Sequence, residues 1–248
     1  MRECQFVRPP AVLWSAVLPL LVVARGSACR LLVPENVGIC LYLQSVGLFR
    51  LLKEAGVEVD DRGIHERQDS QLIVPLTRFK TEGEVERLAN EALEALVRAG
   101  MGSANLYPLV SEVFAELALN AVQHSESPIG SFGIIQFYES QAGRRFVCAV
   151  ADGGIGIRQS LERNPALADK VAYDWDAIEL ALEEGISGTG SKTRGIGLFG
   201  VAEDMRKPAR QLIIHSGIGM LQITEATQSE PQRTTLFPGT LISASIAT

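Results

Sequence analysis

The order of the predicted elements is the feature that most constrains the fold of this chain. Helical patterns cover residues 81–99 and 107–124. Strand-like segments follow at 133–139 and 144–152, with a turn at Gly143. Further helices are predicted at about 174–184 and 196–206, and further strands at 210–216, 219–226 and 239–247. Helices followed by an antiparallel run of strands predict a two-layer α/β sandwich, a mixed, mainly antiparallel sheet with helices on one face.

The helix over residues 81–99 has the clearest limits. Thr81 can cap its first turn, Glu84 completes a capping box, and Gly100 ends the helix. Apolar residues recur at helical spacing and form one stripe: Val85, Leu88, Ala89, Ala92, Leu96 and Val97. The pattern predicts an amphipathic helix with one buried face.

Composition excludes some classes of function. Hydrophobic residues make up 46% of the 248 residues, which is enough for a sizeable core. The net charge is −6 and no run of Lys or Arg exceeds two residues, so nucleic-acid binding is not indicated. The cysteines show no CxxC spacing and are expected to be buried free thiols of a reducing compartment: Cys4, Cys29, Cys40 and Cys148. The expected location is cytoplasmic.

An apolar run at residues 11–24 leaves three interpretations open. It follows Arg2 and Arg8 and precedes small residues, an arrangement similar to that of a signal peptide. At fourteen residues it is short for a membrane span, although it could serve as an anchor. The alternatives are a buried core segment and a start codon assigned too far upstream.

The chain divides into three parts. Residues 1–30 form the apolar N-terminal segment, 31–75 a small region without an assigned role, and 76–248 the predicted sandwich. Within the second part, residues 36–55 indicate a helix that stops at Gly56. The polar stretch that follows reads as a linker or exposed hairpin, with a boundary near residue 73.

Four polar residues are spaced by four along the helix at 107–124: Glu112, Glu116, Asn120 and His124. Since four residues advance a helix by about 40° beyond one turn, they share one slowly winding face. Such a row either lines a cleft at the edge of the core or forms an exposed stripe.

The strand at 144–152 ends in a carboxylate followed by glycines. Asp152 precedes Gly153, Gly154 and Gly156, so a hydrogen-bond acceptor stands beside backbone that has no Cβ atoms. Such an aspartate can accept a hydrogen bond from an exocyclic amine, and a planar base could lie against the glycines. The alternative is a tight turn with no ligand.

The glycine-rich stretch at 185–200 suits phosphate binding but matches neither of two well-known loops. Both the Walker A loop and the dinucleotide fingerprint need a strand that runs directly into the glycines. The segment before Gly185 reads as a helix instead. Glycine amides, a helix N-terminus and the cations Lys192 and Arg194 could still hold phosphate oxygens. The alternative is a flexible surface loop.

Taken in order, four motifs resemble a known superfamily. Their residues are Glu116, Asn120, Ala121 and His124; Asp152, Gly154 and Gly156; Arg194, Gly195, Gly197 and Leu198; and Gly239 with Thr240. This order is similar to that of the ATPase superfamily of gyrases, heat-shock chaperones, histidine kinases and mismatch-repair proteins, called GHKL. The resemblance covers about residues 76–248 and implies the Bergerat ATP-binding fold.

The resemblance implies ATP and Mg²⁺ as cofactors. Asn120 would ligate the Mg²⁺ that bridges the phosphates, and Glu116 would orient or deprotonate the attacking group. Asp152 would bind the adenine amino group, and residues 157–194 would form a mobile lid. The remaining contacts to the nucleotide would come from His124, Gly154, Gly156, Lys192, Arg194, Gly195, Gly197, Leu198 and Thr240. For His124, a packing role is equally compatible.

Within the superfamily, the chain most resembles the compact anti-sigma-factor type of serine/threonine kinase. Little sequence follows the last predicted strand, which leaves no room for the transducer domain of gyrase-like members. The implied partner is a STAS-type anti-sigma antagonist or a sigma factor, and a homodimer is possible. In a histidine kinase system the partner would be a response regulator, but the one candidate phospho-acceptor, His65, lies in a turn-rich stretch. A third alternative is a non-catalytic ATP-binding module.

Overall fold

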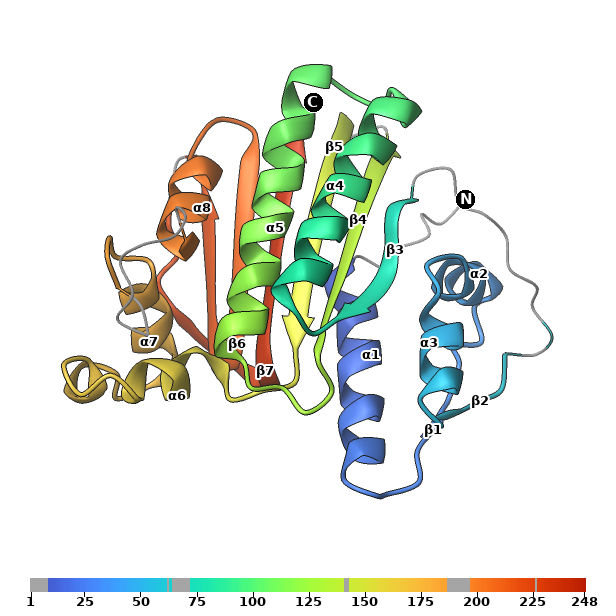
Figure 1. The fold of residues 1–248 in the computed structure, drawn as a ribbon, viewed down its shortest axis with the longest axis horizontal. Coiled ribbons are helices and arrows are strands. Elements are labelled where there is room, and N and C mark those ends of the chain that lie inside the picture. The colour runs from blue at the N-terminus through green and yellow to red at the C-terminus, as the bar shows by residue number, and fades with distance from the viewer. Residues whose placement is uncertain (1–8, 62, 64–71, 141–142, 187–196, 226) are drawn as a thin grey trace.

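The computed structural model describes residues 9–61, 63, 72–140, 143–186, 197–225 and 227–248. Its centre is a five-stranded antiparallel sheet with the order β3-β4-β5-β7-β6 (Figure 1). The strands are β3 (Leu72–Phe79), β4 (Ser131–Ser140), β5 (Gly143–Asp152), β6 (Arg210–Thr224) and β7 (Gln232–Ala247). The central strand β5 is buried along most of its length, and its last residue, Asp152, lies in the interior.

Most of the helices that follow β3 cover one face of this sheet, which agrees with the predicted two-layer α/β sandwich. The long helices α4 (Glu82–Ala99) and α5 (Tyr107–His124) lie side by side on it, joined through the short η1 (Ala104–Leu106). As predicted, Thr81 and Glu84 form a capping box at the start of α4, and Gly100 adopts a left-handed conformation at its end. The helices α7 (Asp174–Ala181) and α8 (Gly197–Met205) pack against β6.

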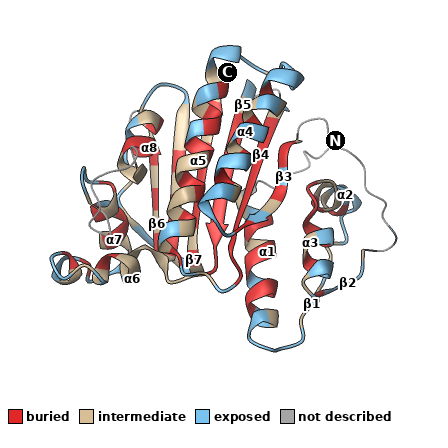
Figure 2. Ribbon diagram, viewed as in Figure 1, coloured by how far each residue is buried: buried red, intermediate tan, exposed pale blue. Residues whose placement is uncertain are grey.

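The apolar N-terminal segment forms a helix that packs on the opposite face of the sheet. This helix, α1 (Pro9–Ala24), contacts β5, β7 and β4. Val12, Leu13, Ala16 and Val17 are completely buried (Figure 2). The structure therefore agrees with one of the three interpretations of this run, that of a buried core segment. No helix within the described ranges is long and apolar enough to cross a membrane.

A small unit links α1 to the edge of the main sheet. It consists of β1 (Arg30–Leu31), α2 (Val37–Ser45), α3 (Leu48–Glu54) and β2 (Glu58–Val59), with β1 and β2 paired in parallel. The hydroxyl of Tyr42 donates to Gln136 of β4 at 2.6 Å, which ties α2 to the sheet. The helix indicated by Leu48, Leu51 and Leu52 before Gly56 is α3, and α2 precedes it, separated from it by Gly47 with a positive φ of 86°.

Two strand predictions need correction. The segments at 210–216 and 219–226 were predicted as separate strands, but both belong to β6, which continues through register shifts around Gly217. Glycine at a bulge looks the same in sequence as glycine at a turn. Strand β3 was not predicted, because the boundary near residue 73 falls at its start.

The thiols mostly follow expectation. Cys40 and Cys148 are buried free thiols, and Cys29 is a half-buried free thiol. Complete burial raises the pKa of Cys148 to about 12, so this thiol stays protonated. Cys4 lies outside the described residues.

Candidate functional site

The carboxylate of Asp152 is the best-defined polar group of the predicted site. It stands at the end of β5, opposite Ser131 of β4, and only 3% of the residue is exposed. Its Oδ1 accepts from the backbone N–H of Gly154 at 2.9 Å and from that of Thr240 at 3.3 Å. Burial raises the pKa of Asp152 to about 7, and the two N–H groups partly oppose this rise. With this pKa, Asp152 is partly ionised at neutral pH, and the ionised carboxylate can accept a hydrogen bond from an amine ligand.

Only glycine fits at two positions around Asp152, because any side chain there would collide with neighbouring protein atoms. A Cβ atom on Gly154 would collide with the backbone carbonyl of Ser125, and one on Gly239 would collide with Asp152 itself. Hydrogen bonds fix the same turn, since Ile155 N donates to Ser125 O at 2.8 Å and Gly153 N donates to the hydroxyl of Ser127 at 3.2 Å. The glycine turn is therefore clamped to the end of α5.

A serine that the sequence analysis missed connects three parts of the site. Ser216 of β6 accepts from Ile157 N at 2.9 Å, at the start of α6 (Gly156–Glu162). Its hydroxyl also lies 3.1 Å from the hydroxyl of Thr240 on β7 and 3.3 Å from the carbonyl oxygen of Gly239. Ser216 occurs near a predicted turn without a motif of its own, so its role emerges only from the pairing of β6 with β7.

The polar row on α5 faces α8, and two of its members show the marks of a site. Asn120 has a buried Nδ2 atom without a hydrogen-bond partner in the described part of the chain. A buried amide left unsatisfied is costly, and a ligand is one way to satisfy it. Glu116 is half-buried; burial raises its pKa, while the backbone N–H of Gly197 lowers it and Glu112 adds to the rise. Glu116 thus meets the first residue of α8.

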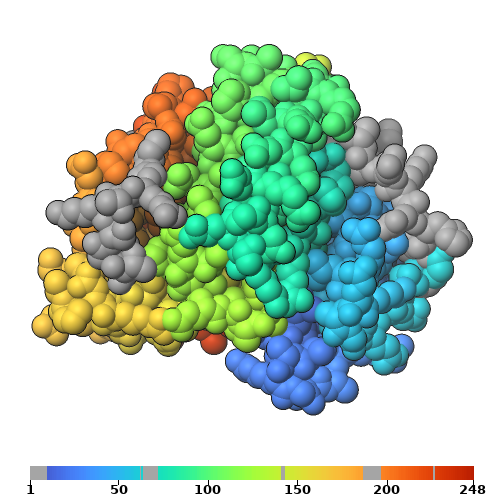
Figure 3. Space-filling view, in the orientation of Figure 1, coloured from blue at the N-terminus to red at the C-terminus, as the bar shows by residue number. Residues whose placement is uncertain are grey.

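The surroundings of this row are visible in the space-filling view (Figure 3). Helix α5 runs through the middle of the face shown, with α8 and the α6–α7 region beside it. His124, at the C-terminal end of α5, is half-buried, and burial lowers its pKa, so the imidazole is neutral at pH 7. Leu198 of α8 packs against the core under the helices. Lys192, Arg194 and Gly195 lie outside the described residues, as does His65.

Much of the predicted lid over residues 157–194 is packed structure. After α6 come η2 (Ala168–Lys170) and α7, and these elements share a small apolar core of Leu161, Leu167, Val171, Ala177 and Leu180. The carboxylate of Asp174 accepts from Ile218 N of β6 at 2.8 Å, which anchors α7 to the sheet. Residues 187–194 of the predicted lid lie outside the described residues.

The described residues do not by themselves form a metal site. Within the described ranges, no three His, Cys, Asp or Glu side chains converge on one point. Asn120 offers one neutral oxygen ligand, so the phosphates of a nucleotide and water would complete the shell of a hard cation. The unsatisfied Nδ2 atom of Asn120 is a hydrogen-bond donor, which an oxygen of such a phosphate could satisfy while the amide oxygen faces the cation.

Comparisons with known proteins give no relative. No protein-family model matches the sequence, and no curated protein and no solved structure matches it either. What this chain does is therefore inferred from its own residues and their geometry.

Proposed function

We propose that this chain is a cytoplasmic Mg-ATP-binding protein of the GHKL type that transfers the γ-phosphate to a serine or threonine of a STAS-like partner. The single observation that carries the proposal is the buried Asp152 carboxylate, fixed by the N–H groups of Gly154 and Thr240 beside a turn clamped to α5. A buried carboxylate acceptor suits a ligand that carries an exocyclic amine.

The roles of the α5 residues follow from their positions. Asn120 would contribute its amide oxygen to a Mg²⁺ that the phosphates also hold. Gly197 begins α8, and backbone N–H groups at a helix N-terminus suit phosphate oxygens. Lys192 and Arg194 would supply positive charge on the same side. Bound nucleotide would supply the transferable phosphoryl group.

Glu116 supports a reaction in addition to binding. Its raised pKa makes it a better proton acceptor than an exposed glutamate, and it lies beside the start of α8. In the proposed step, Glu116 accepts the proton of the attacking hydroxyl while the new O–P bond forms and the bond between the β- and γ-phosphates breaks. A module that only binds nucleotide has no use for such a base.

The test starts with nucleotide binding. The full chain, the Asp152→Asn variant and the control Asp169→Asn, whose carboxylate is exposed on η2, are titrated with Mg-ATP by calorimetry. We expect wild type and control to bind alike and Asp152→Asn to lose at least about 100-fold in affinity, because an amine ligand would then face a donor. Equal affinity in a folded Asp152→Asn variant would refute the base-binding role. An Asn120→Ala variant should also lose the Mg²⁺ dependence of binding.

Transfer is tested separately with γ-labelled ATP and candidate STAS partners. Acid-stable label on the partner, absent with Glu116→Gln, is the expected result. Acid-labile label on the chain itself would instead indicate a histidine kinase, and tight binding without label or released phosphate would indicate a nucleotide sensor.

A further inference from the structure

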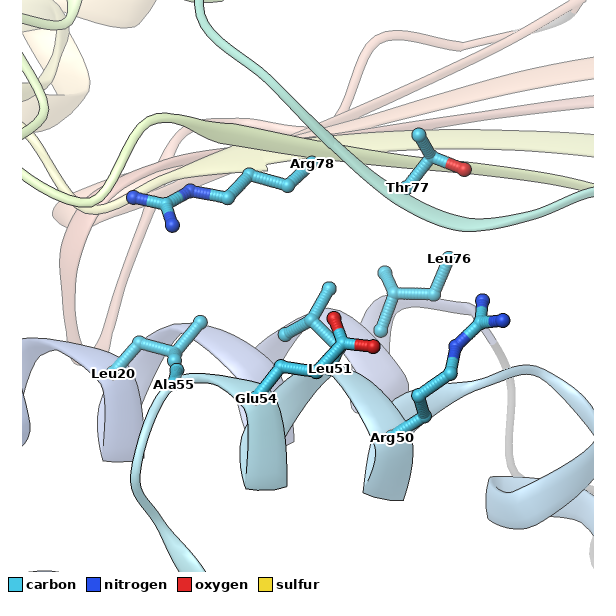
Figure 4. A pocket seen from close by; sticks show the side chains of 8 residues that line it. All are labelled: Leu20, Arg50, Leu51, Glu54, Ala55, Leu76, Thr77 and Arg78. Atoms are coloured by element: carbon cyan, nitrogen blue, oxygen red, sulfur yellow. The ribbon is translucent and has the colours of Figure 1, made fainter.

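A hollow of about 250 Å³ lies at the seam between the N-terminal elements and the main sheet. Its apolar lining comes from Leu20 of α1, Leu51 and Ala55 of α3, and Leu76 of the edge strand β3 (Figure 4). Ligand sites form preferentially where structural units meet over an apolar floor. This hollow is separate from the residues around Asp152.

Three charged residues border this floor, and all three are exposed. Arg50 and Glu54 rise from α3, while Arg78 extends from β3 above Leu20 and Ala55 (Figure 4). None of the three forms an ion pair or hydrogen bond with the described part of the chain. Their neighbour Lys53, in contrast, pairs with Asp61 at 2.6 Å. Two exposed cations and one exposed anion thus border the hollow without an ion pair among the described residues.

We propose that this hollow binds an apolar α-amino acid. Arg78 suits its carboxylate, because a guanidinium group binds a carboxylate through paired N–H donors. Glu54 suits the ammonium group, and the leucine-rich floor suits the side chain. The hollow, at about 250 Å³, has room for a small molecule of about nine non-hydrogen atoms. Free L-leucine has that size.

Helix α1 connects this hollow with the turn that carries Asp152. Leu20 lines the hollow, and the next residue, Leu21, packs at Gly153, where an added Cβ would lie 3.0 Å from its Cδ2 atom. A ligand that shifts α1 therefore changes the position of the glycine turn. Amino-acid binding should alter nucleotide affinity, and nucleotide should alter amino-acid affinity by the same factor. This second half of the inference rests on the proposed function.

Direct binding is tested first, by calorimetry on the full chain without nucleotide. The probes are L-leucine, 4-methylpentanoate, which lacks the ammonium group, and 3-methylbutylamine, which lacks the carboxylate. We expect L-leucine to bind at least about 10-fold more tightly than either, since each lacks one charge-assisted contact. Failure of L-leucine to bind would overturn the site. Equal affinity for 4-methylpentanoate would overturn the role of Glu54.

Variants locate the site. Arg78→Gln and Glu54→Gln should each weaken L-leucine binding by about 10- to 100-fold, because each removes one charged partner. Both side chains are exposed, so these changes should leave folding intact. Arg98→Gln, at an exposed position of α4, is the matched control and should bind as the wild type does. Unchanged affinity in both hollow variants would contradict the assignment.

The coupling is tested by titrating ATP with and without saturating L-leucine. A change in ATP affinity of about 3-fold or more, lost in Arg78→Gln, is the expected result. An unchanged ATP affinity, while both ligands bind, would overturn the coupling. Absence of ATP binding under all conditions would overturn the proposed function and with it the coupling, and would leave the amino-acid site standing.

Discussion

Replacing Asp152 by asparagine should stabilise the ligand-free chain at neutral and alkaline pH while removing nucleotide binding. The buried carboxylate has a pKa of about 7 in the folded chain, against the ordinary value of 3.8. Asparagine keeps an oxygen for the N–H groups of Gly154 and Thr240 but carries no charge. Any charge-related cost of burying Asp152 should therefore disappear in the variant.

The magnitude follows from the two pKa values. Below pH 3.8 the carboxyl is protonated in both the folded and the unfolded chain and costs nothing. Between 3.8 and about 7 the unfolded chain releases the proton and the folded chain retains it, so the free energy of unfolding falls by about 1.4 kcal/mol per pH unit. Above pH 7 the accumulated cost is about 4 kcal/mol. The asparagine amide makes weaker hydrogen bonds, which should cost about 1 kcal/mol. Asp152→Asn should therefore be about 3 kcal/mol more stable than wild type at pH 8.

The assay is urea unfolding of both proteins at a series of pH values from 4 to 8.5. The variant and the wild type share all other titrating groups, including His124 and His215. Their contributions therefore cancel in the difference between the two unfolding free energies. We expect this difference to rise from pH 4 to pH 7 and then level off. Asp169→Asn should give a flat difference near zero. A flat difference for Asp152→Asn would refute the burial-based pKa and the reasoning built on it. In wild type, ATP affinity should fall about 10-fold per pH unit below pH 7, as the acceptor becomes protonated.

The remaining predictions concern the base, the glycine turn and the N-terminal helix. Glu116→Gln should retain Mg-ATP affinity within about 2-fold and lose transfer by about 100-fold or more in a single-turnover assay; normal transfer would mean that another group is the base. Gly154→Ala should cost about 3 kcal/mol or more in urea unfolding, because its Cβ would meet the Ser125 backbone, whereas Gly83→Ala, with open space on α4, should be neutral or stabilising. Val17→Asp should abolish folding as seen by circular dichroism, because Val17 is completely buried, while Leu18→Asp, at a residue 41% exposed on the same helix, should fold. A folded Val17→Asp variant would contradict a core role for α1.

Local signals explain what could be predicted about the fold. The capping box of α4, the apolar stripe on that helix and the apolar runs of β4 and β5 each lie within a short stretch of sequence, so each of these elements could be predicted without its neighbours. Strand β3 and the continuous β6 could not be read in this way. A strand acquires its identity from the partner with which it pairs, and the glycines of β6 are compatible with a turn or with a bulge.

The candidate site, like the fold, could be predicted from the sequence only in part. The sequence placed Glu116 and Asn120 on one helix face and Asp152 at a strand end before glycines, and these positions are where the structure has them. It could not identify Ser216 or Ser125, because each contributes through a contact with a distant segment. Sequence spacing specifies the face of an element but not what lies opposite to it.

The sequence by itself determined the type and the limits of most elements and the order of the polar motifs along them, because these depend on backbone propensity and on side-chain periodicity. Tertiary structure alone decided that residues 9–24 are core, that Leu21 touches Gly153, and that Asp152 is buried deeply enough to raise its pKa to about 7. Burial and the electrostatic cost of burial arise from atoms far away in the chain, so they exist only once the layers have packed.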